Sequence, residues 1–369
     1  MKVLLCSPYL QQAGIISGGI NMWAHNLLEY RKTIESDVIL IPISFDRRNY
    51  VSVDSNMVRR IRLGIKEFSV AVKEAKRAMK KETIDVVHLC SSASISLTKD
   101  ILVLKAARKR NIKTVFHLHF GRIPELFAQK NWEWHLLTKA ASLADIIVTM
   151  DMRSYETLKS LKYNVVYCPN PLSIDVEKQI KQEGEFIKRL PNKVVFIGHV
   201  LPSKGVYELI EAGLHQDNIE LHVIGKAEEP ILSELKTIAK KKEEGKWVIF
   251  RGEITHENVI RELMSASLFA FPSHTEGFPN VILEAMACGT PIVTTNVGAI
   301  PQMLDAEKTG IYGICVGPKD VSSFSNGMKY FLNNPIKAFD CAKRAQKRVN
   351  ELYACSTVWN QLVCIWNNC

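Results

Sequence analysis

Short apolar runs alternate with stretches of helical periodicity along most of the chain. In the first 170 residues, the runs predict strands at 2–8, 38–43, 85–89, 114–118, 145–149 and 165–168. These runs are continuously apolar, which is typical of strands that are buried on both faces of a sheet. Because helical patterns lie between most of them, the sequence predicts an α/β fold, with a parallel sheet and helices on both sides.

The alternation is interrupted at CPNPLSID, residues 168–175, and a charged, weakly periodic stretch continues to about Asn192. Strand candidates then resume at 193–198, 219–224, 247–250, 268–271, 291–294 and 311–316. We therefore expect two doubly wound, Rossmann-like domains, residues 1–170 and 171–353. A ligand cleft is expected between them, at the carboxyl ends of the strands. A last helix at about 354–369 could pack back on the first domain.

Length and composition fit this interpretation. A chain of 369 residues suits two domains, each large enough to bury a core. With 47% hydrophobic and 23% charged residues, the composition excludes an intrinsically disordered chain. The net charge of +10 suits nucleic acid, an anionic membrane surface or a phosphorylated ligand, without choosing among them.

The cysteines and the apolar runs bear on the compartment. Nine cysteines are scattered along the chain with no CxxC pair, which argues against a disulfide framework and a zinc site. We interpret them as reduced thiols of a cytoplasmic protein. The apolar run at 3–6 is shorter than the roughly 7–15 residues of a signal-peptide core. No run reaches the roughly 18 apolar residues of a membrane span.

The segment SHTEGFPNVILEAMACGTPIV, residues 273–293, carries the most informative chemistry. Glu276 lies in the loop after a predicted strand, Pro279 and Asn280 open a helix, and Glu284 lies over one turn into it. A helix N-terminus attracts phosphate, so both acids could face one ligand, one near a sugar and the other near a ribose. By spacing alone, the pair is more simply read as two surface acids near a helix start.

With its flanks, this segment resembles the E-x7-E motif of the family-four retaining glycosyltransferases, which have the GT-B fold. The match includes EGFPN and LEAMACGTPIV. The resemblance implies two Rossmann-like domains that face a central cleft, a nucleotide-sugar donor, retention of the anomeric configuration, and neither an essential metal nor a cofactor. It implies that the donor is bound by Glu276, Gly277, Phe278, Asn280, Val281 and Glu284. Glu276 would hold hydroxyls of the transferred sugar, and Glu284 the ribose.

GHVLPSKG, residues 198–205, resembles a second loop of this family, in which a lysine grips the donor diphosphate. Lys204 falls at that position, at a strand end beside a helix N-terminus, where a lysine is a suitable phosphate clamp. A lone lysine in a loop would otherwise be merely solvated. His199 stands where the family usually has arginine. Since histidine is charged only below about pH 6.5, we expect another base to compensate or donor affinity to be lower.

The first domain offers weaker candidates. Gly18 and Gly19 precede a helix, and the family has a glycine pair here near the donor phosphates and the acceptor, although an ordinary loop is the simpler reading. His119 fits the family's functional histidine at the end of a strand and is expected to contact the donor sugar. His117 shares its face unless the strand ends between them. His88 is expected at the end of another strand, on the acceptor side. Packing or solvated histidines are the alternative for all three.

Two further loops depart from the family. Residues 225–227, Gly-Lys-Ala, lack a second glycine, and Ala299 and Gln302 replace a common glycine and glutamate. We expect backbone amides to remain available at Gly298 and Ala299.

A basic helical stretch spans 59–81, with nine Lys or Arg, two Glu and one apolar stripe. A core-packing helix with a solvated basic face is the plain interpretation. We favour a mixed role, in which the stripe packs on the first domain and the basic face turns toward an anionic membrane. A nucleic-acid partner is not expected, because no basic motif with interleaved aromatics is present.

Together these features predict a retaining, metal-independent glycosyltransferase in which Glu276, Lys204 and His119 are the catalytic candidates. A UDP-sugar is the first choice of donor and GDP-mannose the second. The expected acceptor is a glycan or a lipid-linked glycan in polysaccharide or cell-envelope biosynthesis, reached from the cytoplasm, with peripheral attachment to the inner face of the membrane. The alternatives are a nucleotide-sugar epimerase of the same fold and a catalytically silent binding member of an assembly complex.

Overall fold

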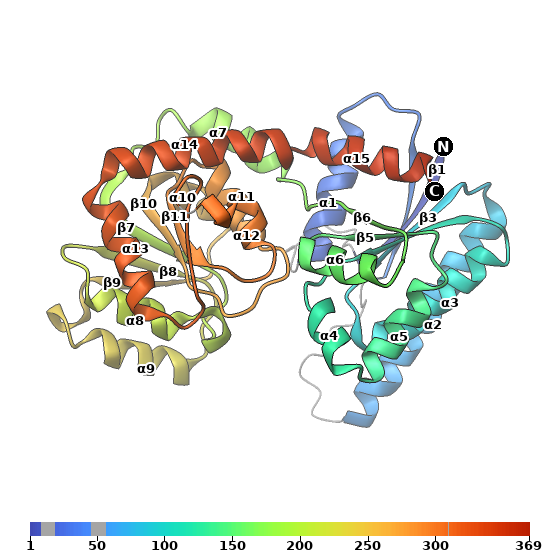
Figure 1. The fold of residues 1–369 in the computed structure, drawn as a ribbon, viewed down its shortest axis with the longest axis horizontal. Coiled ribbons are helices and arrows are strands. Elements are labelled where there is room, and N and C mark those ends of the chain that lie inside the picture. Colours follow the sequence, from blue (N-terminus) through green and yellow to red (C-terminus); the bar gives the residue numbers. More distant parts are fainter. Residues whose placement is uncertain (9–18, 46–56, 309) are drawn as a thin grey trace. The chain divides into compact units, whose positions relative to one another are not determined.

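The computed structural model describes residues 1–8, 19–45, 57–308 and 310–369, without the side chains of 57–67 and 308. These residues form two compact units (Figure 1). Unit 1 comprises Met1–Pro171 and Cys355–Cys369, and unit 2 comprises Leu172–Ala354.

Unit 1 is built on a parallel six-stranded sheet with the order β2-β1-β3-β4-β5-β6. Its strands are β1 (Lys2–Ser7), β2 (Ile39–Ser44), β3 (Val86–Ser91), β4 (Lys113–Leu118), β5 (Ile146–Thr149) and β6 (Val165–Tyr167). Its helices are α1 (Gly19–Lys32), α2 (Met57–Lys81), α3 (Leu97–Arg108), α4 (Ile123–Gln129), α5 (Trp132–Ala141), α6 (Met152–Ser160) and α15 (Cys355–Asn367), with a 3-10 turn at Ser94–Ser96.

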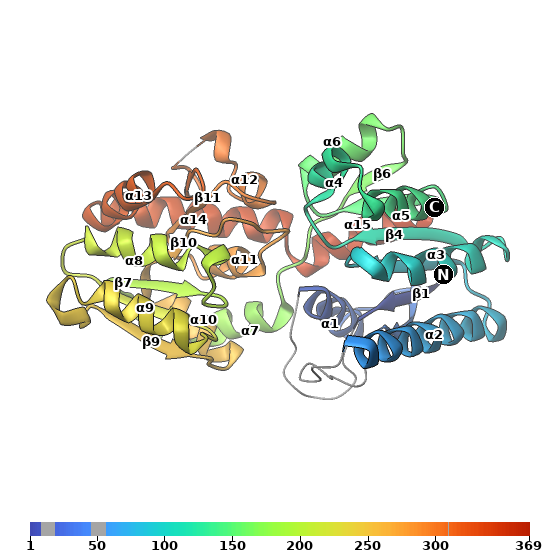
Figure 2. The ribbon, with the colours of Figure 1, turned by 90° about the horizontal axis from the view of Figure 1, so that it is seen from below.

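Both faces of this sheet are buried. Leu4 and Cys6 of β1 enter a core shared with α2 and α3, whereas Val3 and Leu5 enter a second core shared with α1 and α15. The ribbon of β1 and of these four helices can be followed in Figure 2. Successive side chains of a strand point to opposite faces, so burial on both sides explains the continuous apolar runs.

Unit 2 has the same architecture, with the strand order β12-β11-β10-β7-β8-β9 and all pairs parallel. Its strands are β7 (Leu190–Ile197), β8 (Glu220–Ile224), β9 (Val248–Gly252), β10 (Ala266–Phe271), β11 (Ile292–Thr295) and β12 (Ile314–Val316). Its helices are α7 (Ile174–Glu183), α8 (Val206–Leu214), α9 (Glu229–Ala239), α10 (His256–Ser265), α11 (Asn280–Ala287), α12 (Ile300–Met303), α13 (Val321–Asn333) and α14 (Pro335–Leu352), with 3-10 turns at Pro202–Lys204, Glu243–Gly245 and Ala306–Lys308. Two doubly wound parallel sheets confirm the predicted α/β class.

The charged stretch after residue 171, which the sequence pattern did not mark as a helix, contains α7. Ser173 caps this helix, since its Oγ accepts a hydrogen bond from the backbone N–H of Asp175 at 3.3 Å. Val176 is its one fully buried residue. A helix that buries so little has a weak apolar period, which is why the pattern missed it.

Unit 2 changes direction between β7 and β10. These strands are hydrogen-bonded neighbours, but the chain continues from β7 toward β8 and β9 on one side, and from β10 toward β11 and β12 on the other. Open α/β sheets bind ligands at the carboxyl ends of such a pair. The loops after β7 and β10 touch there, because the Cβ of any other residue at Gly205 would lie 2.0 Å from the carbonyl oxygen of Pro272.

Two glycines of unit 2 distinguish the effect of this loop contact on stability from the effect of a strained backbone conformation. Gly205 and Gly252 have φ values of +70° and +67°, but a Cβ at Gly252 would meet nothing within 4 Å. Gly205→Ala should therefore lower the free energy of unfolding by about 2–4 kcal/mol, from strain plus overlap, and Gly252→Ala by about 1 kcal/mol, from strain alone. Urea-induced unfolding measures both. Equal losses would show that the two loops do not pack as described.

Candidate functional site

Loops at the carboxyl ends of neighbouring strands in unit 2 pack backbone against backbone. A Cβ at Gly298, after β11, would lie 2.4 Å from the carbonyl oxygen of Glu276, in the loop after β10. A Cβ at Gly225, after β8, would lie 1.9 Å from the carbonyl oxygen of Gly198, after β7. Both glycines have positive φ, at +56° and +142°. The site that these loops form is thus held by main-chain contacts that only glycine permits.

Lys204 and Glu276 form an ion pair at this place. Lys204 ends the 3-10 turn before α8, and its Nζ lies 2.5 Å from Oε1 of Glu276 and 5.9 Å from the centroid of the Phe271 ring. The side chains are 25% and 10% exposed. Partial burial reduces the screening of this ion pair by water, which strengthens the attraction between the two charges.

Glu284 has a partner that sequence reasoning missed. On α11, its Oε1 lies 2.9 Å from Nε2 of His256, the first residue of α10. The hydrogen bond from His256 to Glu284 raises the pKa of that histidine above its ordinary value, against the opposing effect of burial. A second missed pair is His274 and Glu208, with Nε2 and Oε1 at 3.0 Å. Spacing gave no signal for either pair, because the partners lie on different elements.

Gly277 and Phe278, which follow Glu276 in the loop, make contacts that hold the loop in place. The Gly277 carbonyl accepts a hydrogen bond from the backbone N–H of Ala299 at 2.9 Å. Our expectation that the Ala299 amide stays available is therefore wrong, because the packing of the two loops uses it. Phe278 is buried, with its ring centroid 6.1 Å from that of Tyr353. The Phe278 ring thus packs this loop against the end of α14.

The start of α11 is displaced by one residue from the expectation. The helix begins at Asn280, and Pro279 occupies the capping position with φ −77° and ψ 107°. Asn280 and Val281 are half-buried, and His199 is exposed in the loop after β7. The donor-binding candidates of unit 2 thus lie on the loops after two adjacent strands and on one helix end.

The glycine pair of unit 1 is described only in part, since Gly18 lies outside the described residues. Gly19 begins α1, and a Cβ there would meet nothing within 4 Å. No described atom crowds its backbone, but the role expected for the glycine pair near the donor phosphates stays a prediction.

Three histidines of unit 1 gather beneath Trp23 of α1. His117 lies on β4 and His119 directly after it, and their ring centroids are 3.9 Å apart. His88 is fully buried within β3, where its Nδ1 accepts a hydrogen bond from Nε1 of Trp366 at 2.9 Å. The expectation that His88 ends a strand is therefore wrong, because it lies inside β3. Trp366 of α15 covers it.

Burial determines the charge of this cluster. It lowers the pKa of His88 and of His119 to about 3, and it lowers the pKa of His117 well below its ordinary value. All three rings are consequently neutral at physiological pH.

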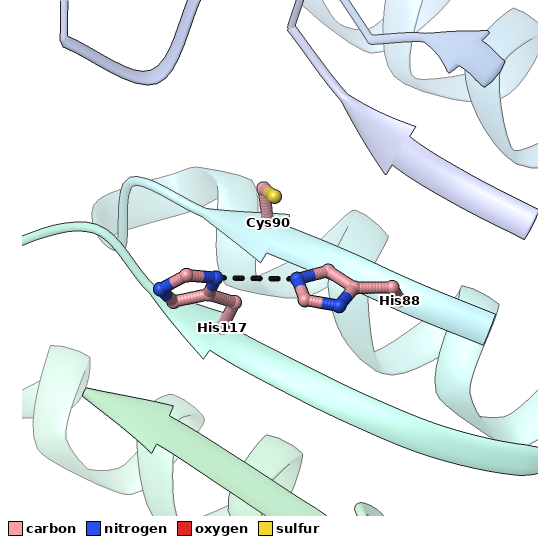
Figure 3. Close-up of side chains that lie close together, drawn as sticks. All are labelled: His88, Cys90 and His117. Carbon is pink, nitrogen blue, oxygen red and sulfur yellow. Dashed lines mark hydrogen bonds between the residues drawn. The ribbon is translucent and has the colours of Figure 1, made fainter. Parts of the chain in front are cut away.

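Among the described residues, His88, Cys90 and His117 are close enough to hold a metal ion (Figure 3). Their hydrogen bonds argue for another state. Nδ1 of His88 accepts from Trp366, so the proton of the neutral ring is on Nε2, the nitrogen that a metal would need. Burial also raises the pKa of the Cys90 thiol, which disfavours the thiolate ligand. The residues fit a hydrogen-bonded chain better than a metal centre.

The basic helix α2 packs as expected over its described part. Val72, Ala75 and Met79 are buried in the core of unit 1. Lys73, Arg77, Lys80 and Lys81 are exposed. Within the described ranges, no helix combines the length and the apolar character that crossing a bilayer requires.

Comparison with known proteins agrees with this geometry. Residues 177–348 match the family Glycosyl transferases group 1. The chain is 27% identical over 195 residues to CapM, the capsular polysaccharide biosynthesis glycosyltransferase of Staphylococcus aureus, a match that covers 51% of this chain and 49% of CapM. It is 22% identical over 375 residues to an uncharacterized glycosyltransferase of Methanocaldococcus jannaschii, covering 95% of this chain and 94% of that protein.

A solved structure shares the whole fold. The Anabaena protein HepE, in complex with UDP, superimposes with a TM-score of 0.71 at 18% identity and with full coverage of both chains. The family match over residues 177–348, the glycosyltransferase relatives and the shared fold together support a GT-B glycosyltransferase of group 1.

Proposed function

We propose that this enzyme moves a hexose or N-acetylhexosamine from a nucleotide-sugar, a UDP-sugar before GDP-mannose, to a glycan or lipid-linked acceptor, with retention and without a metal. The observation that carries the proposal is the Lys204–Glu276 pair at the point where the sheet of unit 2 changes direction. Two relatives support the choice of substrates, since HepE was solved with UDP and CapM acts in capsular polysaccharide biosynthesis.

The proposed reaction depends on neutralising the negative charge of the leaving diphosphate. The bond between the anomeric carbon and the diphosphate oxygen breaks, a bond to the acceptor oxygen forms, and the acceptor proton passes to the leaving phosphate. Lys204, helped by His199, neutralises the departing diphosphate, and the positive end of the α11 dipole adds support. We therefore assign no general base among the side chains.

Lys204 and Glu276 change partners during donor binding in this scheme. In the free protein the carboxylate neutralises the lysine at 2.5 Å. A bound diphosphate takes over Lys204, and Glu276 then accepts hydrogen bonds from hydroxyls of the sugar. Glu284 and the neighbouring His256 hold the ribose.

Nucleotide selectivity is the first test. UDP should raise the Tm of the protein more than GDP or ADP at equal concentration, because a ligand that binds only the folded state stabilises it. Lys204→Met should abolish most of that shift. Lys236→Met, which removes the same charge from an exposed position on α9, should preserve it. Equal shifts in the two variants would contradict the role of Lys204.

The two glutamates should separate turnover from affinity. Glu276→Ala should reduce kcat at least about a hundredfold with a smaller change in UDP affinity, because its contacts go to the reacting sugar. Glu284→Gln should mainly weaken UDP binding. It should also lower the pKa of His256, measured by NMR titration, because the hydrogen bond to Glu284 is the largest cause of the raised value. Unchanged UDP affinity in Glu284→Gln would overturn this division.

The His256–Glu284 pair predicts how the stability of the folded protein changes with pH. Since the folded-state pKa of His256 is raised, its contribution to stability is present below the unfolded value near 6.5 and is lost as the pH rises through the folded value.

We also propose that α2 attaches the enzyme to an anionic membrane surface. Reversing Lys73, Arg77 and Lys80 to glutamate should weaken sedimentation with phosphatidylserine vesicles at least about tenfold, since each basic residue contributes about 1 kcal/mol. Reversing Lys337, Lys343 and Lys347 on the exposed face of α14 is the matched control and should have a smaller effect. Equal effects of the two triple reversals would show that the attraction to the vesicles depends only on net charge and not on α2.

A further inference from the structure

Helices α10 and α11 of unit 2 lie side by side and run in the same direction. Near the start of α10, Nε2 of His256 lies 2.9 Å from Oε1 of Glu284. Near its end, the hydroxyl group of Thr290, just beyond α11, donates a hydrogen bond to the carbonyl oxygen of Leu263 at 2.7 Å. The two contacts follow one another in the same order along both helices. The position of Glu284 therefore depends on how α10 and α11 are joined.

Arg189, the residue before β7, joins the carboxyl ends of these two helices. Its Nη2 donates hydrogen bonds to the carbonyl oxygen of Cys288, at 2.7 Å, and to that of Gly289, at the end of α11. Its Nη1 donates to the carbonyl oxygen of Ala266 at 2.6 Å, at the end of α10, and to Oγ1 of Thr290 at 3.4 Å. One guanidinium group therefore holds both helix ends at once.

The positive charge of Arg189 is balanced by backbone carbonyl groups. Among the described residues its hydrogen-bond acceptors are three carbonyl oxygens and one hydroxyl group, and it forms no ion pair with a carboxylate. A guanidinium stays ionised in a protein, although burial lowers the pKa of Arg189. The carbonyl groups at a helix carboxyl end carry its partial negative charge, which attracts a cation. Since an apolar side chain would fill a buried space at a lower desolvation cost, the charge indicates a role beyond packing.

Glu284 lies one turn before the carbonyl groups that Arg189 holds. The backbone N–H of Cys288 donates to the carbonyl oxygen of Glu284 at 2.9 Å, so the two residues belong to the same helical turn. α11 has 8 residues, about two turns, and a helix this short takes its stability from tertiary contacts. Without its anchor the last turn of α11 would loosen, and the carboxylate of Glu284 would move relative to His256.

We propose that Arg189 is a positioning residue for the nucleotide: by anchoring the carboxyl ends of α10 and α11, it keeps Glu284 beside His256 and in place to bind the ribose. That Glu284 binds a ribose rests on the proposed function. The effect of Arg189 on the His256–Glu284 pair does not, because it is measured on the protein alone.

Two arginine variants separate this role from stability. Arg189→Met removes the guanidinium and keeps an apolar stem. Arg31→Met is the matched control, since Arg31 of unit 1 also donates to three backbone carbonyl oxygens, those of Ile34, Ser36 and Val38. Both variants should lower the urea-unfolding midpoint, and only Arg189→Met should change the nucleotide site.

NMR titration of His256 in the full chain reports the position of Glu284 directly. The hydrogen bond with Glu284 is the largest cause of the raised pKa of His256. Arg189→Met should therefore lower that pKa, and Arg31→Met should leave it unchanged. Arg189→Lys should lower it less, because lysine keeps the charge but loses the planar fork of donors. An unchanged pKa of His256 in Arg189→Met would overturn the positioning role.

Binding of UDP to the folded variants tests the consequence for the donor. Calorimetric titration below both unfolding midpoints should show an affinity for UDP that is reduced at least about fivefold in Arg189→Met and unchanged in Arg31→Met. Arg189→Met should cause no further loss in a Glu284→Gln background, because both changes act on the same contact. Losses that add in full would overturn the route through Glu284.

The other outcomes are equally decisive. A lower unfolding midpoint for Arg189→Met, together with the UDP affinity and the His256 pKa of the wild type, would show that Arg189 only stabilises the fold. If Arg189→Met does not fold, Arg189→Lys replaces it in every comparison, with smaller changes in the same direction. Failure of wild-type protein to bind UDP would overturn the proposed donor, while the titration of His256 would still decide the role of Arg189.

Discussion

β7 and β10 pair side by side in the sheet of unit 2, although the chain leaves them in opposite directions, and the candidate donor site depends on that adjacency. It brings together Lys204 and Glu276, which are 72 residues apart in the sequence. The loops could not approach with side chains at Gly205 or Gly298, since a Cβ at either would overlap a carbonyl oxygen. The positions of the charged groups in the site thus depend on how closely the backbones of the two loops can pack.

Unit 1 depends on a different constraint, the burial of polar rings. The face of its sheet under α1 and α15 holds His88 and His117 among apolar residues, and burial keeps both rings neutral. Neutral rings can form a directed chain of hydrogen bonds, whereas charged ones would repel each other. Trp366 starts that chain from the far end of the sequence, so the last helix contributes to the chemistry of the first unit as well as to its core.

The sequence predicted the strands well, because burial on both faces makes each a continuous apolar run. It also singled out Glu276 and Lys204, whose loops follow a strand and precede a helix, and the structure brings these two side chains together, while their roles stay a prediction. It missed α7, which buries only Val176 fully. It also missed contacts between side chains of distant elements, such as His256 with Glu284. It placed His88 at the end of a strand, whereas this residue lies within β3 and accepts a hydrogen bond from Trp366. Pattern and spacing report on local structure and burial, whereas such contacts depend on tertiary packing.

The proposed function requires that a nucleoside diphosphate binds where the loops after β7 and β10 meet. Backbone amide hydrogen exchange, with and without saturating UDP, tests it most directly, because bound phosphates would protect the amides that they contact. Within unit 2, protection should centre on 198–205 and 273–284, and Lys204→Met should abolish it. Protection centred instead on α9 or on the amino ends of the strands, or protection that persists in Lys204→Met, would show that the nucleotide does not bind at these loops through Lys204.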